Sequence, residues 1–546
     1  MKKVVDKIFN NVSLTPEDLE KRYPSRNLPE GAFVTRLGPS PTGFIHMGNL
    51  YGAFVDERLA HQSGGKFYLR IEDTDDKRLV EGAVEQIIEG LKYFGVEFDE
   101  GALAEGEMGD YGPYTQSERV DIYHVYAKKL MEEGKAYPCF LTEEEIAEIR
   151  QNQENSKATP GIYGDYSKYR NAGEDTILEL IESGQPYVVR LKSDGVEGEN
   201  AKYISVQDGI RGELSIPENF HDTVILKTNG VPTYHFAHVV DDHLMRTTHV
   251  VRGEEWLSTL PIHIELFEKL GFEIPMYCHT AQLMKIDETG NKRKLSKRKD
   301  PELSLGYYTE QGYHPLTIRE YLLTILNSNF EEWRIANPDA DANDFAFTMA
   351  KMSTSGALFD MNKLDDVSKD VLLKLNAKEL YDFLVDWSKQ YDESFYKLIV
   401  GREDYLLKIL DLGRDGNKPR KDLVYAKQIV KFISYFFEER FVIEDELPAE
   451  VVEDKKVILE KYLASYNHSD NQETWFNKIR EIADELGYAL RPKDYKKNPN
   501  QFKGHVGHVS TVVRLAVMGR TNSPDIWEIQ QILGEEITRK RLEKFA

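Results

Sequence analysis

Apolar and polar positions alternate in two different ways along the first third of the chain. Residues 33–37 (FVTRL) and 66–71 (KFYLRI) are short apolar runs bounded by glycine or by acidic turn residues, which predicts β-strands. From His46 onward, and again over 80–94, apolar residues recur at helical spacing. Strand and helix alternating in this way are typical of a parallel α/β sheet, and we predict such a sheet here.

The pattern becomes mixed further along the chain. A Glu-rich helix is expected from Thr142, and alternating positions near 187–191 predict a strand. We interpret this region as an inserted domain. The apolar runs at 223–226 and 248–251 then indicate a return to the α/β sheet.

Helical periodicity dominates from Pro301 to the end, and repeated amphipathic segments after Leu375 predict an all-helical C-terminal domain. Charge sets the end of this domain apart. Residues 476–546 carry 13 Lys and Arg against 9 Asp and Glu, a net +4, whereas the whole chain has a net charge of -23. The overall charge argues against indiscriminate binding to nucleic acid, but the tail offers a locally basic surface.

Composition narrows the class of protein. The 546 residues are enough for three or four domains at about 150 residues each. No run approaches the roughly 20 apolar residues that cross a bilayer, so we expect no membrane association. Only Cys139 and Cys278 are present, which excludes a disulfide framework and a four-sulfur metal site. We expect a cytoplasmic protein without zinc.

The loop that follows the first predicted strand has the features of an anion site. Residues 38–43 (GPSPTG) forbid a helix, and the helix begins near His46. The first N–H groups of a helix lack partners and lie at the positive end of its dipole, so a phosphate would bind there. His46 could add a hydrogen bond, and Gly43 and Gly48 would let a ligand approach the backbone. The structural alternative is a tight loop whose histidine only caps the helix.

A second candidate is the basic run Lys292–Lys299, in which six of eight residues are Lys or Arg. The functional interpretation is a mobile arm that neutralises the charge of departing pyrophosphate. The alternative is a solvated surface.

Together and in this order the two segments resemble the paired signatures of class I aminoacyl-tRNA synthetases. TRLGPSPTGFIHMGN, LRIEDTD, GPYTQSER, PTYHFAHVVDDHLM, THVVRGEEWL and KLSKR follow the order and approximate spacing of the glutamyl-tRNA synthetases. The tail segments SGALFDMNKL and GRTNSPDIWEIQQILGEE are similar to the helical half of the bacterial enzymes. The resemblance covers essentially everything after residue 30.

The resemblance implies an α/β fold, with a Rossmann-type class I catalytic domain, an inserted α+β acceptor-binding domain and an all-helical anticodon-binding domain. The expected parts are an N-terminal extension (1–30), the catalytic domain (31–115 and 211–300), the acceptor-stem-binding insertion (116–210), a stem-contact domain (301–375) and the anticodon-binding domain (376–546).

The implied activity is that of a glutamate–tRNA ligase. Such an enzyme activates L-glutamate with ATP, releases pyrophosphate and transfers the glutamyl group to the 3′-terminal adenosine of tRNA-Glu. Mg²⁺ is expected with the nucleotide, and no covalent enzyme intermediate is needed. Whether tRNA-Gln is also charged stays open, and we expect a monomer.

The resemblance also implies site residues. The expected catalytic residues are His46, Lys294 and Lys297. The residues expected to bind ATP are Pro39, Thr42, Gly43, His46, Gly48, Asn49, Ser296, Lys297 and Arg298. Those expected to bind glutamate are Arg36, Ser40, Glu72, Tyr234, His238 and Arg252.

Arg252 carries the choice of amino acid, because a guanidinium suits a γ-carboxylate and matches a γ-amide poorly. One departure concerns His238, which stands where the bacterial enzymes commonly have Asn and which could introduce pH sensitivity. A second is the single cysteine near residue 139, where bacterial relatives often hold a zinc knuckle.

Four alternatives compete with this interpretation. The glutaminyl enzymes share the catalytic fold but end in β-barrels, whereas this tail is helical in pattern. A paralogue that has lost catalysis would not need both His46 and Lys297. A small nucleotidylyltransferase and a truncated tRNA-modifying paralogue would both lack the long helical tail.

Overall fold

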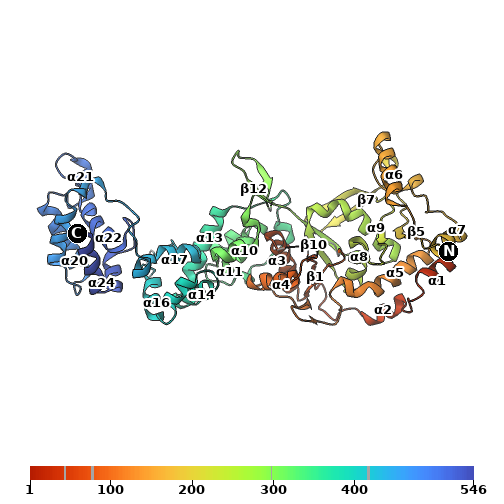
Figure 1. The fold of residues 1–546 in the computed structure, drawn as a ribbon, viewed down its shortest axis with the longest axis horizontal. Helices are drawn as coiled ribbons and strands as arrows, with labels where there is room; N and C mark the ends of the chain where they lie inside the picture. The colour runs from red at the N-terminus through yellow and green to blue at the C-terminus, as the bar shows by residue number, and fades with distance from the viewer. Residues whose placement is uncertain (42, 44, 76–78, 297, 415–418) are drawn as a thin grey trace. The chain divides into compact units, whose positions relative to one another are not determined.

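A computed structural model describes residues 1–41, 43, 45–75, 79–296, 298–414 and 419–546. The chain divides into two compact units (Figure 1). The first contains residues 1–307 and 318–360, and the second contains residues 308–317 and 361–546. No helix in the described ranges is long and apolar enough to cross a membrane.

A parallel sheet forms the centre of the first unit. β1 (Val34–Leu37) pairs with β2 (Lys66–Leu69), and β2 pairs with β3 (Glu100–Ala102), all in parallel. β10 (His249–Gly253) and β11 (Met276–Thr280) form a second parallel pair.

The strands β1 to β3 and the pair β10 and β11 join in one sheet. The N–H of Thr248 donates to the carbonyl oxygen of Val34 at 3.0 Å, which places β10 beside β1. The strands then lie in the order β3-β2-β1-β10-β11. β2 and β3 follow on one side of β1, and β10 and β11 follow on the other, so the strand order reverses between β1 and β10. In sheets of this kind ligands bind outside the carboxyl ends of the strands at that reversal. The predicted parallel α/β sheet is therefore confirmed.

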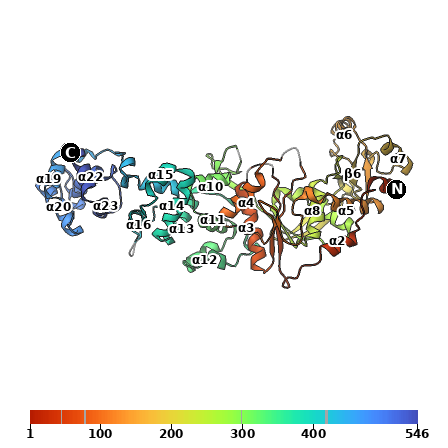
Figure 2. The same ribbon diagram turned by 60° about the horizontal axis from the view of Figure 1, so that its bottom comes forward.

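Helices cover both faces of this sheet. Successive side chains of a strand point to opposite faces. Thr35 accordingly donates to the carbonyl oxygen of Asp56 on α3 (Met47–Gln62), whereas Arg36 bonds Asp242 on α8 (Tyr234–Leu244). Figure 2 shows α3 against the strands. The remaining helices around the sheet are α4 (Ala83–Tyr93), α5 (Val120–Glu132) and α9 (Leu260–Leu270).

The inserted region contains an antiparallel sheet of β5 (Ala136–Cys139), β6 (Val188–Leu191) and β9 (Val224–Leu226). Its helices are α6 (Glu143–Ser156) and α7 (Glu174–Glu182), and Thr142 caps α6 as the sequence predicts. The expectation that 223–226 rejoins the parallel sheet is wrong, because β9 pairs with β6. A short local run identifies a strand but not its partner.

A hairpin of β7 (Tyr203–Asp208) and β8 (Gly212–Pro217) spans the expected boundary at 210/211. Its end reaches the parallel sheet, where Asp208 stands opposite Tyr277 of β11. β4 (Glu107–Met108) is a short antiparallel strand on β3.

The first 30 residues belong to the first unit. α1 (Lys2–Ile8) packs against α5 and α7, and Thr15 caps α2 (Pro16–Arg22). Farther along, the Arg26 guanidinium pairs with Glu100 of β3 at 2.7 Å. This segment therefore connects the insertion with the central sheet.

The basic run is partly a strand. β13 (Lys292–Lys294) pairs antiparallel with β12 (Leu283–Ile286), and β12 pairs in parallel with β14 (Ala357–Leu358). Only helices were predicted after Pro301, so the strand β14 was missed. The β12–β13 hairpin projects from the first unit (Figure 1).

Helices dominate the rest of the chain, as predicted. The series runs α10 (Leu305–Gln311), α11 (Pro315–Leu326), α12 (Phe330–Ala336), α13 (Met361–Lys374), α14 (Ala377–Tyr391), α15 (Glu393–Ile399), α16 (Glu403–Asp411), α17 (Ala426–Phe432), α18 (Ala449–Val452), α19 (Lys455–Ser465), α20 (Gln472–Glu485), α21 (Pro492–Lys497), α22 (Val506–Met518), α23 (Ile526–Leu533) and α24 (Glu535–Phe545). A single apolar cluster from α13 to α24 forms the core of the second unit.

Candidate active site

A cavity of about 830 Å³ lies at the carboxyl ends of β1 and β10, where the strand order reverses. Its wall includes the loop after β1, the beginnings of α3 and α8, the end of β10 and the β12–β13 hairpin. Most of the site residues predicted from the sequence line it: Arg36, Pro39, Ser40, Gly43, His46, Gly48, Asn49, Glu72, Tyr234, Arg252 and Lys294.

The other five predicted residues either lie outside the described residues or do not line the cavity. Thr42 and Lys297 lie outside the described residues. Ser296 and Arg298 belong to the basic run but do not line the cavity, and His238 is buried beneath it.

His46 is the N-cap of α3 and lines the cavity. Its backbone is extended, and its Nδ1 accepts a hydrogen bond from the N–H of Gly48 at 3.1 Å. The side chain of Asn49 bonds back to the N–H of His46 and completes a capping box. With Nδ1 an acceptor, the proton of the neutral ring is on Nε2. The capping interpretation of His46 is confirmed, and its role toward a phosphate stays a prediction.

Gly38 makes room for Glu72. A Cβ on Gly38 would overlap Oε1 of Glu72, which receives a hydrogen bond from Nη2 of Arg70 at 2.8 Å. Burial raises the pKa of Glu72, while Arg70 and Arg36 oppose that rise. The carboxylate is therefore held at the cavity wall by its arginine neighbours.

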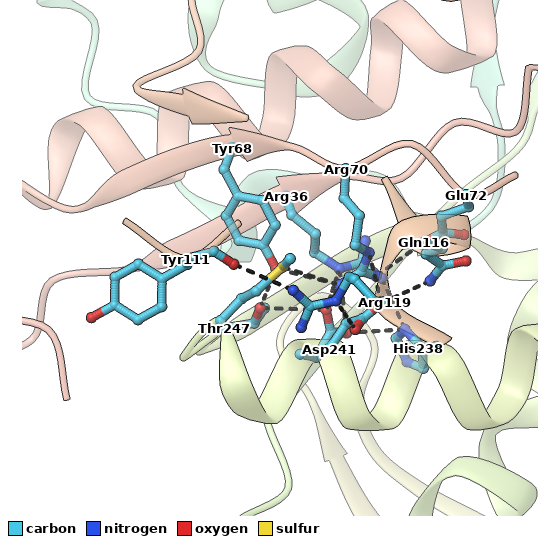
Figure 3. Close-up of polar contacts among 12 residues, drawn as sticks. Arg36, Tyr68, Arg70, Glu72, Tyr111, Gln116, Arg119, His238, Asp241 and Thr247 are labelled. Carbon is cyan, nitrogen blue, oxygen red and sulfur yellow. Dashed lines mark hydrogen bonds and ion pairs between the residues drawn. The ribbon is translucent and has the colours of Figure 1, made fainter. Parts of the chain in front are cut away.

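Buried ion pairs link the central strands to α8 (Figure 3). Asp242 Oδ1 lies 2.7 Å from Nη1 of Arg70 and 3.2 Å from Nε of Arg36. Although burial raises the pKa of Asp242, Arg36 and Arg70 hold it well below its usual range. Behind this pair, Asp241 accepts bonds from Arg119 at 2.7 Å and from Gln116 at 2.9 Å. These contacts fix α8 and with it Tyr234.

His238 is part of this network. Its Nδ1 lies 3.0 Å from Asp242 and 3.3 Å from Nη2 of Arg36, and its Nε2 lies 2.9 Å from the hydroxyl of Tyr277. Burial lowers the pKa of His238 to about 3. The pH sensitivity considered from the sequence is therefore not expected near neutral pH, and the ring supports Arg36 from below.

Arg252 has different surroundings. It is 8% exposed, and its contacts are imidazole nitrogens of His279 and His263, the carbonyl oxygen of Trp256 and the ring of Tyr277. In the described part of the chain no carboxylate pairs with it. Arg36, Arg70 and Arg119 each have at least one. Arg252 thus presents a buried positive charge to the cavity, a situation that favours an anionic ligand.

The part of the basic run before Lys297 is anchored to the fold. Arg293 forms two bonds with Asp300, at 2.6 and 2.7 Å, and Asp300 also accepts from the N–H of Ser296. Leu295 is buried between them, whereas Lys294 is exposed and lines the cavity. Lys292–Lys294 pair as a strand, so this part of the expected arm has regular structure, and its mobility stays a prediction.

A sequence model described as "tRNA synthetases class I (E and Q), catalytic domain" matches residues 32–366, more than half of the chain. The chain belongs to this family of class I tRNA synthetases. A second model, "Anticodon binding domain", matches residues 498–546. Both matches confirm the predicted fold class and the family resemblance.

Relatives of this synthetase match along nearly its whole length. The glutamate–tRNA ligase of Acetivibrio thermocellus is 58% identical over 545 residues, covering 100% of this chain and 99% of that protein. The glutamate–tRNA ligase of Clostridium perfringens is 50% identical and covers 98% of both chains. The similarity to the first relative includes the 30-residue N-terminal segment, which contains none of the motifs that carried the resemblance.

A solved structure supports the same assignment. The crystal structure of a glutamate tRNA ligase from Elizabethkingia meningosepticum in complex with its amino acid has a TM-score of 0.73 and 26% identity. It covers 94% of this synthetase and 99% of its own chain.

The structure of this synthetase adds cavity residues that sequence reasoning missed. Lys227 follows β9 and donates to the carbonyl oxygen of Thr74, and the Trp256 ring lies 4.9 Å from that of Tyr234. The Asp56 carboxyl group is buried in the wall, where neither of its oxygens has a hydrogen-bond partner among described atoms, and burial raises its pKa well above the usual value. Trp256 lies within the THVVRGEEWL segment, whereas Lys227 had no local signal.

The described residues of this synthetase contain no group of three or more His, Cys, Asp or Glu side chains that could hold a metal ion. Both cysteines are buried and free. The prediction that the protein holds no zinc stays a prediction.

Proposed function

We propose that this synthetase is a glutamate–tRNA ligase that works at the cavity between β1 and β10. It joins the α-carboxylate of L-glutamate to the α-phosphorus of ATP, releases pyrophosphate and passes the glutamyl group to the 3′-terminal adenosine of tRNA-Glu. The observation that carries the proposal is the buried Arg252 guanidinium at the cavity wall, which lacks a carboxylate among the described residues. The γ-carboxylate of glutamate supplies the missing charge, whereas a γ-amide does not.

The other glutamate contacts follow from the polarity of the wall. The Glu72 carboxylate accepts from the substrate ammonium group, and the Tyr234 hydroxyl and Ser40 supply neutral hydrogen bonds. Arg36 faces the α-carboxylate, while Asp242 holds its guanidinium in place. His238 acts on the substrate only through Arg36.

ATP binds at the beginning of α3. The helix N-terminus and the Nε2–H of His46 stabilise the charge of the α-phosphate, and Gly43, which has no atom near the position of a Cβ, leaves space beside it. Pro39, Thr42, Gly48 and Asn49 complete this side of the nucleotide. Lys294 and Lys297, with Ser296 and Arg298 beside them, neutralise the departing pyrophosphate.

Catalysis then needs no covalent intermediate on the protein. The cavity aligns the carboxylate with phosphorus and stabilises the charge that develops on the phosphate oxygens, which are the two contributions that phosphoryl chemistry requires. Mg²⁺ accompanies the triphosphate and takes its oxygens as ligands, so it needs few or no protein carboxylates.

The tRNA would contact several parts of the chain. We assign the acceptor end to the insertion (116–210), the stem to 301–375 and the anticodon to 376–546. The anticodon-binding match over 498–546 supports the last assignment. The enzyme is further proposed to be a cytoplasmic monomer without zinc.

Aminoacylation tests the proposal directly. Labelled L-glutamate and L-glutamine are each offered with tRNA-Glu and with tRNA-Gln. We expect glutamate to be joined to tRNA-Glu and glutamine to be rejected. Glutamate on both tRNAs would mean a non-discriminating enzyme, and no glutamate on either would refute the proposal. Metal analysis and sedimentation of the same preparation test the zinc and monomer statements.

A further inference from the structure

Arg252 is held by two imidazoles. Its Nε lies 3.0 Å from Nε2 of His279, and its Nη1 lies 3.0 Å from Nδ1 of His263. A guanidinium has only donors, so both of these imidazole nitrogens must be unprotonated acceptors. Each ring is therefore neutral and carries its proton on the other nitrogen.

The second nitrogen of each ring has a partner that suits this assignment. Nε2 of His263, which carries the proton when Nδ1 accepts, lies 3.0 Å from Nδ1 of His235 and can donate to it. Nδ1 of His279 lies 2.6 Å from Oδ2 of Asp208 and donates to that carboxylate. Two chains of contacts thus fix the tautomers, one ending at His235 and the other at Asp208.

Burial keeps these rings neutral. His263 and His279 are both fully buried, and burial lowers the pKa of each. The positive charge of Arg252 adds to this effect at both rings. Asp208 opposes it at His279 and is separated from Arg252 by the imidazole.

Three other buried arginines near this sheet are held by carboxylates, which orient a guanidinium and also neutralise it. Asp242 does this for Arg36 and Arg70, and Asp241 does it for Arg119. An imidazole accepts the same kind of hydrogen bond without bringing a negative charge. A carboxylate therefore cancels the charge of the arginine that it holds, whereas the imidazoles leave the charge of Arg252 available.

We propose that His263 and His279 are positioning residues that set the selectivity for glutamate, because they orient Arg252 with neutral acceptors and reserve its charge for the γ-carboxylate. This inference rests on the proposed function. It predicts that an anionic acceptor in the place of either ring would keep Arg252 in position but weaken glutamate binding.

The matched pair His263→Asn and His263→Asp tests it. The side-chain oxygen of either residue can take the place of Nδ1, and the two differ in charge rather than in shape. An aspartate beside Arg252 stays ionised because the guanidinium favours its charged form. Both variants lose the same ring volume, so their melting temperatures should fall together.

The readout is the KM for glutamate at saturating ATP and tRNA-Glu, with the KM for ATP measured alongside. We expect about a 3-fold increase for His263→Asn and about a 100-fold increase for His263→Asp, since a competing charge on one partner of a close ion pair has effects of this size. The KM for ATP should change equally little in both. The preference for glutamate over glutamine should fall only in His263→Asp.

A second pair of variants, at His279, tests the inference if the His263 variants fail to fold. His279→Gln keeps an acceptor near the position of Nε2, whereas His279→Met removes it, so the KM for glutamate should rise clearly more in His279→Met. Equal glutamate KM values for His263→Asn and His263→Asp would overturn the inference, while glutamate charging by the unaltered enzyme would leave the proposed function intact. No glutamate charging by the unaltered enzyme would overturn both.

Discussion

His46 and His505 occupy the same place in two different helices. His46 precedes α3 with φ -130° and ψ 167°, and His505 precedes α22 with φ -136° and ψ 167°. In each case Nδ1 accepts from the N–H two residues later, at 3.1 Å for Gly48 and 3.0 Å for Gly507. The capping role is thus shared, but only His46 lines the cavity.

Substitutions at these two histidines allow the capping role of His46 to be tested separately from its proposed catalytic role. Asparagine is a strong N-cap, so His46→Asn should keep the stability of α3 while removing the imidazole donor to phosphate. We expect kcat for aminoacylation to fall about 100-fold or more, with the melting temperature nearly unchanged. His505→Asn, measured in the same melting experiment, shows what the exchange costs at a cap outside the cavity. A normal kcat for His46→Asn would contradict the assigned role.

Arg252→Gln removes the charge proposed to select glutamate. The expected loss in kcat/KM for glutamate is about 1000-fold, since truncating one partner of a buried charged pair costs 2–5 kcal/mol or more. Steady-state aminoacylation with varied glutamate measures it, and the KM for ATP serves as the internal control. A loss confined to ATP would argue that Arg252 belongs to the nucleotide site.

Gly38→Ala should displace the Glu72 carboxylate, because the new methyl group would occupy the position of Oε1. We expect the KM for glutamate to rise about 10-fold, the loss of one charge-assisted hydrogen bond to the substrate ammonium. Gly173→Ala is the matched control, since a Cβ there meets no atom within 4 Å. If both variants keep the normal KM, Glu72 does not bind the ammonium group.

Asp242→Asn should destabilise the first unit. The carboxylate compensates both Arg36 and Arg70, and removing one partner from a buried ion pair costs about 3–5 kcal/mol. A lower melting temperature checks this. Glu182→Gln, which removes an exposed partner of Lys7 in the same unit, should leave the melting temperature unchanged.

The buried neutral histidines should make the fold less stable in acid. Burial lowers the pKa of His235 to about 4, of His238 to about 3 and of His249 to about 4, against about 6.5 when unfolded. Between pH 6.5 and 4 the unfolded chain therefore binds more protons, and stability falls as pH falls. Each such histidine contributes up to about 1.4 kcal/mol per pH unit.

Urea unfolding at several pH values measures this dependence. The histidine contribution to the free energy of unfolding should be flat above pH 7 and decline below about 6.5. His238→Asn should reduce the decline, because it removes one of these groups. An equal decline in His238→Asn and in the unaltered protein would show that His238 is not held neutral in the fold.

The sequence predicted what depends on local order. The strand, the GPSPTG loop and the start of α3 are consecutive, so their residue types alone place His46 at a helix N-terminus. Pairing between distant segments was not predictable in the same way. β9 has the composition of a buried strand, but its partner β6 is set by tertiary structure.

Isolated residues were missed for a similar reason. His263 and His279 sit alone in apolar surroundings and form no motif, and their role becomes visible only where both meet Arg252. In the basic run, the density of positive charge suggested a loop. Pairing with β12 and the bonds from Arg293 to Asp300 nevertheless order its first half.

The position of β9 has a consequence for exchanging parts between related enzymes. Because β9 pairs with β6 and leads directly to Lys227 in the cavity wall, the insertion is not a separable cassette. A chimera that exchanged residues 116–210 would give β9 a partner strand from the other parent. A workable exchange must extend past Lys227, so the part proposed to grip the acceptor end and one wall residue of the catalytic cavity are inherited together.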